Sequence, residues 1–167
     1  MADFYLEFSE AISGITEEEL AWIKAIPDRG DFEDSTLWDD EDWKPAYAEK
    51  LKEHGIDVQE FLDDESIDTF PHFCWEAEKG GNWWISTHGD ESGAPAHVAW
   101  VVQAFIKKFR PDFVFTLTWC EYCSKPRIGT FGGGWVAVNK DEKLFGNTWQ
   151  DADEKAKALQ DKKKEDE

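Results

Sequence analysis

The stretch FPHFCWEAEKGGNWWISTHG, Phe70 to Gly89, predicts a β-hairpin around which the rest of the fold is arranged. Two runs rich in aromatic residues flank the pair Gly80–Gly81. Aromatic residues favour strands, and a Gly-Gly pair supplies the backbone angles that a tight hairpin turn needs. Trp83 and Trp84 would point to opposite sides of their strand. One of them should therefore lie outside the main core, either at a protein-binding surface or beneath the acidic segment or the terminal helix.

The segment that follows the hairpin predicts a helix and then two strands. Over Ala94–Phe109 five apolar residues recur at helical spacing: Val98, Val101, Val102, Phe105 and Phe109. Pro111 ends this helix. Asp112–Trp119 alternates apolar and polar side chains, as a strand does, and Trp135–Asn139 is expected to be another strand. Residues 148–160 are expected to form a terminal helix, with a frayed charged tail after it.

The N-terminal part predicts a short strand over residues 4–8 and two helices. Thr16 and Glu19 have the spacing of a capping box, so a helix should start after Thr16 and end at Pro27. A second helix should start at Pro45 and end near Gly55, which suits a helix C-terminus.

This order of elements predicts an α+β fold, a mostly antiparallel four- to five-stranded sheet with helices packed on one face. We expect a single domain over residues 1–150, with an acidic helical portion over 1–70 and a sheet-rich portion over 71–150. A terminal helix and charged tail would occupy 151–167.

Charge is concentrated in the first portion of the chain. The formal net charge is −19, and residues 1–70 hold 22 acids and 5 bases, against 15 and 13 in residues 71–167. Such a field repels nucleic acid and anionic membranes and attracts basic surfaces. We therefore expect no direct contact with nucleic acid or membrane, and a basic protein as partner. The absence of a signal-like N-terminus or an apolar run of membrane length, together with three cysteines, favours a cytoplasmic location.

The acidic residues between 28 and 68 suggest electrostatic mimicry of DNA. Much of the affinity of DNA-binding proteins comes from matching the phosphate charge, so a folded array of carboxylates can occupy the same basic cleft. Tryptophans would anchor this array. The candidate partner-binding residues are Asp31, Glu33, Asp34, Trp38, Asp39, Asp40, Glu41, Asp42, Trp43, Asp63, Asp64 and Glu65. The alternative is an acidic surface that serves solubility alone.

A second hypothesis concerns a Cys/His set that has the ligand types of tetrahedral zinc. His72 and Cys74 lie on one expected strand, and Cys120 and Cys123 form C-x-x-C at the end of another. Free buried thiols or a redox pair are the alternatives. No other cofactor is expected, and no Ser-His-Asp or nucleophile-elbow pattern is found, so a non-enzymatic role is favoured.

The stretch CSKPRIGTFGGGW, Cys123 to Trp135, contains Lys125 and Arg127 before Gly132, Gly133 and Gly134. An anion-binding or ligand-binding loop is one interpretation. However, phosphate loops lead into a helix, whereas these glycines lead into an expected strand. The other interpretation is that the glycines permit a bulge or close contact with a large aromatic neighbour.

The stretches FCWEAEKGGNWWIS and CSKPRIGTFGGG together resemble a family of small, uncharacterised proteins of bacteria, phages and mobile elements, over roughly residues 70–140. The family brings no established activity or site. Small, very acidic proteins on mobile elements often resemble antirestriction or anti-CRISPR inhibitors of DNA-handling enzymes. The resemblance therefore implies an inhibitor that occupies the nucleic-acid cleft of such an enzyme.

Overall fold

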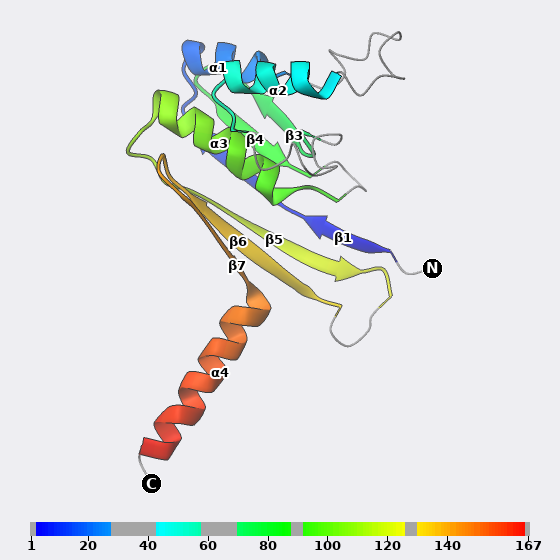
Figure 1. The fold of residues 1–167 in the computed structure, drawn as a ribbon, viewed down its shortest axis with the longest axis vertical. Helices are drawn as coiled ribbons and strands as arrows, with labels where there is room; N and C mark the ends of the chain where they lie inside the picture. The colour runs from blue at the N-terminus through cyan, green and yellow to red at the C-terminus, as the bar shows by residue number, and fades with distance from the viewer. Residues whose placement is uncertain (1–2, 28–42, 58–69, 88–91, 126–129, 166–167) are drawn as a thin grey trace.

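The computed structural model describes residues 3–27, 43–57, 70–87, 92–125 and 130–165, and it has the expected α+β class. These described ranges contain four helices and seven strands (Figure 1). The strands form two antiparallel sheets, where the sequence predicted a single sheet of four or five strands. The helices pack against the sheets, as expected for this class.

The larger sheet has the order β1-β5-β6-β7, with β1 at Phe4–Glu7, β5 at Phe115–Cys123, β6 at Gly132–Val138 and β7 at Lys143–Asn147. The smaller has the order β2-β4-β3, with β2 at Ser9–Ser13, β3 at Cys74–Ala77 and β4 at Asn82–Ser86. Buried Phe8 lies where the chain passes from β1 into β2, and so from one sheet to the other. Neither β2 nor β7 was predicted from the sequence, because both are short and half-polar.

The hairpin expected around Gly80–Gly81 is present as β3 and β4. Trp83 is fully buried against Phe105, with ring centroids 5.2 Å apart, whereas Trp84 is 51% exposed. The expectation that one of the two tryptophans lies outside the core is therefore confirmed. The smaller sheet uses its inward face for the core and leaves its other face open at Trp84.

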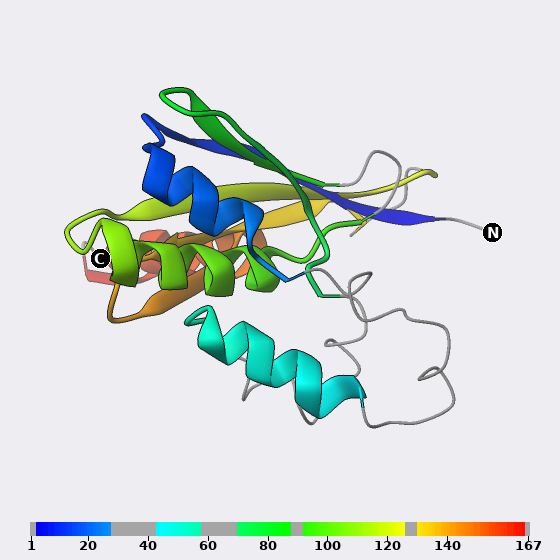
Figure 2. The ribbon, with the colours of Figure 1, turned by 90° about the horizontal axis from the view of Figure 1, so that it is seen from above.

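The four helices are α1 at Glu17–Lys24, α2 at Trp43–Glu53, α3 at Pro95–Phe109 and α4 at Thr148–Glu165. Helix α3 is the centre of the core, and nine of the ten residues from His97 to Ile106 are buried. It lies between the larger sheet and the pair α1 and α2 (Figures 1 and 2). This position explains why its apolar residues are more numerous than one helix face requires.

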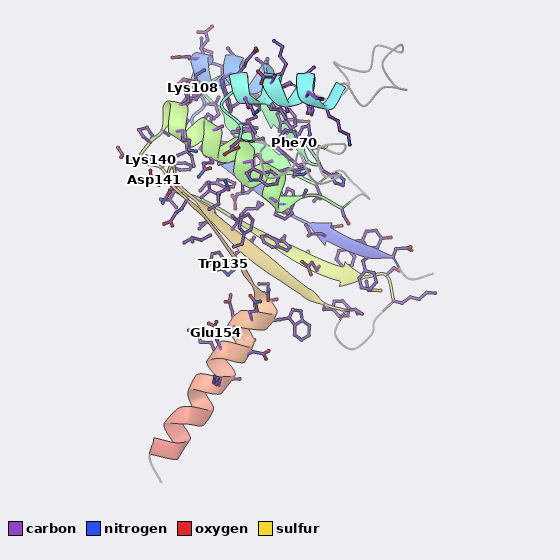
Figure 3. All side chains as sticks on the ribbon, viewed as in Figure 1. Phe70, Lys108, Trp135, Lys140, Asp141 and Glu154 are labelled. Atoms are coloured by element: carbon purple, nitrogen blue, oxygen red, sulfur yellow. The ribbon has the colours of Figure 1, made fainter. Side chains whose placement is uncertain are left out.

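Helix α4 projects away from the larger sheet, which it touches at its first turn (Figure 1). The Thr148 hydroxyl donates to the Gly133 carbonyl oxygen at 3.1 Å, and Trp135 Nε1 donates to Asp151 Oδ2 at 2.9 Å. Trp135 lies beside the start of this helix in Figure 3. None of the helices in the described ranges combines the length and the apolar composition needed to cross a membrane.

Candidate functional site

All of the acidic residues predicted to bind a partner, and Trp38 with them, lie outside the described residues, in segments 28–42 and 58–69. Trp43 is the first residue of α2, and its side chain is likewise outside the description. These two segments together hold thirteen acids and one base. The structure does describe the residues that border each segment. Helix α2 lies between the two segments in the chain and also contacts their outer borders, and these bordering residues with α2 form the framework of the segments.

Tyr47 of α2 holds together the residues that border the two segments. Its buried hydroxyl lies 2.9 Å from the carbonyl oxygen of Phe70, directly after residues 58–69, and donates a hydrogen bond to it. The same hydroxyl lies 3.3 Å from the carbonyl oxygen of Pro27, directly before residues 28–42. One side chain thus brings the beginning of the first acidic segment and the end of the second to a single point.

The other two borders are the ends of α2 itself. Residues 28–42 lead directly into Trp43, and residues 58–69 begin just after the helix ends. Gly55 has φ +82°, its N–H donates to Lys52 O at 2.8 Å, and the Ile56 N–H donates to Leu51 O at 2.9 Å. These are the two hydrogen bonds of a Schellman motif, which confirms Gly55 as the expected end of this helix.

Helix α2 is fixed to α1 through an aromatic contact. The His54 ring stacks on Trp22 with centroids 4.3 Å apart, and His54 Nε2 lies 2.9 Å from the Trp22 carbonyl oxygen. Burial lowers the pKa of His54 from its ordinary value. The neutral imidazole is therefore the form that packs between the two helices.

His97 of α3 fixes the chain just after the second acidic segment. The His72 backbone N–H donates to His97 Nδ1 at 3.0 Å, and the His97 ring lies 5.0 Å from the ring of Phe70 and 5.5 Å from that of Trp100. Phe70 thus packs between Tyr47 of α2 and His97 of α3. Burial, and to a lesser extent the neighbouring His72, lowers the pKa of His97 to about 4.

The other predicted sites are spread over both sheets and do not converge. Cys120 and Cys123 are three residues apart on the continuous strand β5, so their side chains point to opposite faces, one exposed and one buried. Cys74 begins β3 in the smaller sheet, and His72 precedes it. Within the described ranges no group of three or more His, Cys, Asp or Glu side chains is placed to hold a metal ion. The geometry therefore gives the zinc hypothesis no support.

The three glycines of the predicted anion loop are part of β6, and Lys125 is exposed before it, while Arg127 lies outside the described residues. A Cβ atom at Gly134 would overlap the indole of Trp119 and lie 2.6 Å from the carbonyl oxygen of Gly146. At Gly133 it would overlap the Trp119 carbonyl oxygen. This geometry agrees with the interpretation that the glycines admit a large aromatic neighbour.

Two glycines of β6 provide a matched pair for testing that interpretation. We expect Gly134→Ala to lower the free energy of unfolding by about 1–3 kcal/mol, because both the Trp119 ring and a backbone oxygen must move. Gly132→Ala should cost less, because its Cβ would meet Trp149 Nε1 at 2.7 Å and that side chain is half exposed and free to shift. Urea unfolding of both variants measures the difference; equal costs would contradict the assignment.

The sequence analysis did not single out Tyr47, His97 or Arg110. Tyr47 occupies an ordinary inward position of an amphipathic helix, and nothing near it in the sequence indicates that its hydroxyl reaches two distant carbonyl groups. Arg110 directly follows α3, a position where the helix dipole alone would account for a cation. In the structure it pairs with Glu19 of α1, 91 positions away.

Comparison of the chain with protein-family models, with curated proteins and with solved structures gave no match.

Proposed function

We propose that this chain is a non-enzymatic binding protein whose acidic segments 28–42 and 58–69 occupy the basic, nucleic-acid-binding cleft of a partner protein. The observation that carries the proposal is the Tyr47 hydroxyl, which contacts the borders of both segments at once. Because the segments are also joined through α2, all four of their borders lie on one framework. Thirteen carboxylates in two segments that start and end on this framework would complement a cleft built to hold phosphates.

The charge of the rest of the chain supports this choice of partner. Residues 71–167 carry nearly balanced charge, so the negative field is a local feature of one portion of the protein. Solubility alone would not require thirteen acids to be concentrated in the two segments that adjoin one helix in the chain. The family resemblance described above points in the same direction, toward an antirestriction or anti-CRISPR type of inhibitor, and that more specific identity is part of the proposal.

The test begins with capture of partners from the host lysate at low salt, followed by their release with high salt or with duplex DNA. We expect one dominant nucleic-acid-handling protein that both treatments displace, because mimicry implies a shared cleft and a salt-dependent affinity. Reversing Asp39, Asp40, Glu41 and Asp42 to lysine should abolish binding to the purified partner. Single substitutions should matter little, because one surface charge contributes less than about 1 kcal/mol.

A control variant separates local charge from total charge. Reversal of Asp141, Glu142, Asp153 and Glu154 changes the net charge by the same amount, but these exposed residues lie near β7 and on α4 (Figure 3). This control should bind the partner like the wild type. If the variant at residues 39–42 binds equally well, or if duplex DNA does not compete, the proposed function is wrong.

Tyr47→Phe tests the framework without changing any charge. The ring stays in the core, but the carbonyl oxygens of Pro27 and Phe70 lose their donor, which should lower the free energy of unfolding by about 1–3 kcal/mol. We also expect weaker binding to the purified partner, since the borders of the two acidic segments are no longer held together. Tyr122→Phe, which removes a hydroxyl bonded to Glu7 on the larger sheet, should leave this affinity unchanged.

A further inference from the structure

The two edges of the larger sheet differ in how their backbone groups are satisfied. At the β1 edge, the Leu6 N–H donates to Ser92 Oγ at 3.2 Å and the Leu6 carbonyl oxygen accepts from the Gly93 N–H at 3.2 Å. That edge is therefore covered by the segment before α3. At the opposite edge, no strand or loop in the described part of the chain forms backbone hydrogen bonds with the outer side of β7. Such an edge is a template for pairing with another strand.

The side chains of β7 favour pairing. Leu144 and Phe145 point to opposite faces of the sheet, and both are about half exposed, at 51% and 50%. Natural edge strands are usually protected by charges, prolines or bulges, and β7 has the sequence KLFGN. Its one charged residue, Lys143, extends its ammonium group to Gln103 Oε1 of α3 at 3.1 Å. The only charge on the strand is thus directed toward α3.

We propose that β7 pairs with β7 of a second copy of this chain, in an antiparallel and two-fold symmetric arrangement that joins the two larger sheets into one. A strand that pairs with itself around its central residue is self-complementary, as a two-fold interface requires. With Phe145 at the centre of the five-residue strand, each Phe145 faces its counterpart, Lys143 faces Asn147, and Leu144 faces Gly146. No like charges are opposed, and an aromatic pair lies on the axis.

Gly146 makes this register sterically suitable. The indole of Trp135 lies directly over Gly146, where a Cβ atom would overlap it. Leu144 of the second copy would arrive beside this ring, so an exposed aliphatic side chain would meet an aromatic surface already fixed by the hydrogen bond from Trp135 Nε1 to Asp151. Pairing of the two copies would therefore remove apolar surface of both Leu144 and Phe145 from water.

The distribution of charge permits two such acidic chains to meet at this edge. The acidic segments are attached to α2, which α3 separates from the larger sheet (Figures 1 and 2). Residues 71–167, which include β7, hold 15 acids and 13 bases. The copies would therefore approach through their nearly neutral portions. This inference does not depend on the proposed function, because it concerns neither the acidic segments nor their partner.

Light scattering coupled to size exclusion, over a concentration series of the purified full chain, tests the proposal. We expect the wild type to show twice the chain mass of 19.3 kDa, and Phe145→Lys to show a single chain mass, because a charge then stands on the edge. Phe4→Lys is the matched control: Phe4 is 65% exposed on the covered strand β1, so this variant should remain dimeric. Circular dichroism verifies that each variant is folded.

A second measurement tests the register independently of any destabilising charge. In a Cys120→Ser background, Phe145→Cys should form a disulfide-linked dimer on mild oxidation, because facing residues of an antiparallel pair have Cβ atoms about 4.5–5.5 Å apart. A wild type that is monomeric up to millimolar concentration would overturn the proposal. So would a dimer that persists in Phe145→Lys or that gives no cross-link through Cys at position 145.

Discussion

Replacing Arg110 with alanine is expected to lower the free energy of unfolding by about 3–5 kcal/mol, because it leaves a buried carboxylate without its partner. Arg110 Nε donates to Glu19 Oε1 at 2.6 Å, and Arg110 Nη2 lies 3.0 Å from Glu19 Oε2. The Glu19 side chain is only 5% exposed. Urea unfolding at neutral pH measures the loss.

The same guanidinium joins three elements of the fold. It also donates to the carbonyl oxygens of Ser13, at 2.9 Å, and Gly14, at 3.0 Å. Ser13 is the last residue of strand β2, and Gly14 follows it. Glu19 in turn accepts from the Thr16 N–H at 2.7 Å in the capping box of α1. Arg110→Lys retains the charge but not this forked set of donors, so we expect it to recover only part of the lost stability.

An exposed ion pair provides the control for this prediction. Lys50 and Glu53 of α2 are 2.8 Å apart, with side chains 56% and 64% exposed. Lys50→Ala should cost no more than about 0.5 kcal/mol, since solvent screens such pairs. If Arg110→Ala costs as little as Lys50→Ala, Arg110 does not hold α1, β2 and α3 together in the way described.

The protein is expected to lose about 2 kcal/mol of stability between pH 7 and pH 5 through His97 alone. The pKa of the buried His97 is lowered to about 4, whereas an unfolded histidine has a pKa of 6.5. Below pH 6.5 the unfolded chain binds a proton that the folded chain does not bind, so acidification favours unfolding. The effect is absent above pH 6.5 and is complete near pH 4.

His97→Gln isolates this contribution, because glutamine can accept the His72 N–H but does not titrate. Its stability should fall less between pH 7 and pH 5 than that of the wild type, as measured by urea unfolding at each pH. His54, whose pKa is also lowered by burial, adds a loss of the same sign that both proteins share. Identical pH profiles for the two proteins would show that His97 does not titrate in this way.

Glu19 acts in a different pH range. Its hydrogen bonds with Arg110 lower the pKa of this carboxyl below its ordinary value of 4.5. The stability that the pair contributes is therefore present above pH 4.5 and is lost as the pH falls through the lowered value. Measurements between pH 7 and pH 5 consequently report on His97 without interference from Glu19.

Several elements were predictable because their signals are local. The capping box of Thr16 and Glu19, the glycine turn between β3 and β4, and the end of α2 at Gly55 each depend on residues within a few positions of one another. The helical spacing of apolar residues likewise predicted α3 almost to its ends. Local hydrogen bonds and steric limits determine such features, so a short stretch of sequence is sufficient to recognise them.

The candidate sites were less predictable. The C-x-x-C pattern suggested a metal site, but pairing with β1 and β6 keeps β5 extended through Cys120 and Cys123, and an extended backbone sends the two thiols apart. Conversely, the close approach of Trp119 to Gly134 depends on the register between β5 and β6. A large aromatic neighbour was one of the interpretations of these glycines, and the sequence could not identify which aromatic residue it would be.

The amino-acid sequence by itself determined the class of the fold, most of its helices, the central hairpin and the concentration of negative charge before residue 70. These depend on composition and on neighbours along the chain. Only the tertiary structure decided that the strands divide into two sheets and that the outer side of β7 is unpaired among the described residues. It also decided that Tyr47, His97 and Arg110 join segments remote in the chain. The reason is physical: a hydrogen bond between residues 20 or 90 positions apart requires that packing first bring them together, and packing is a property of the whole core.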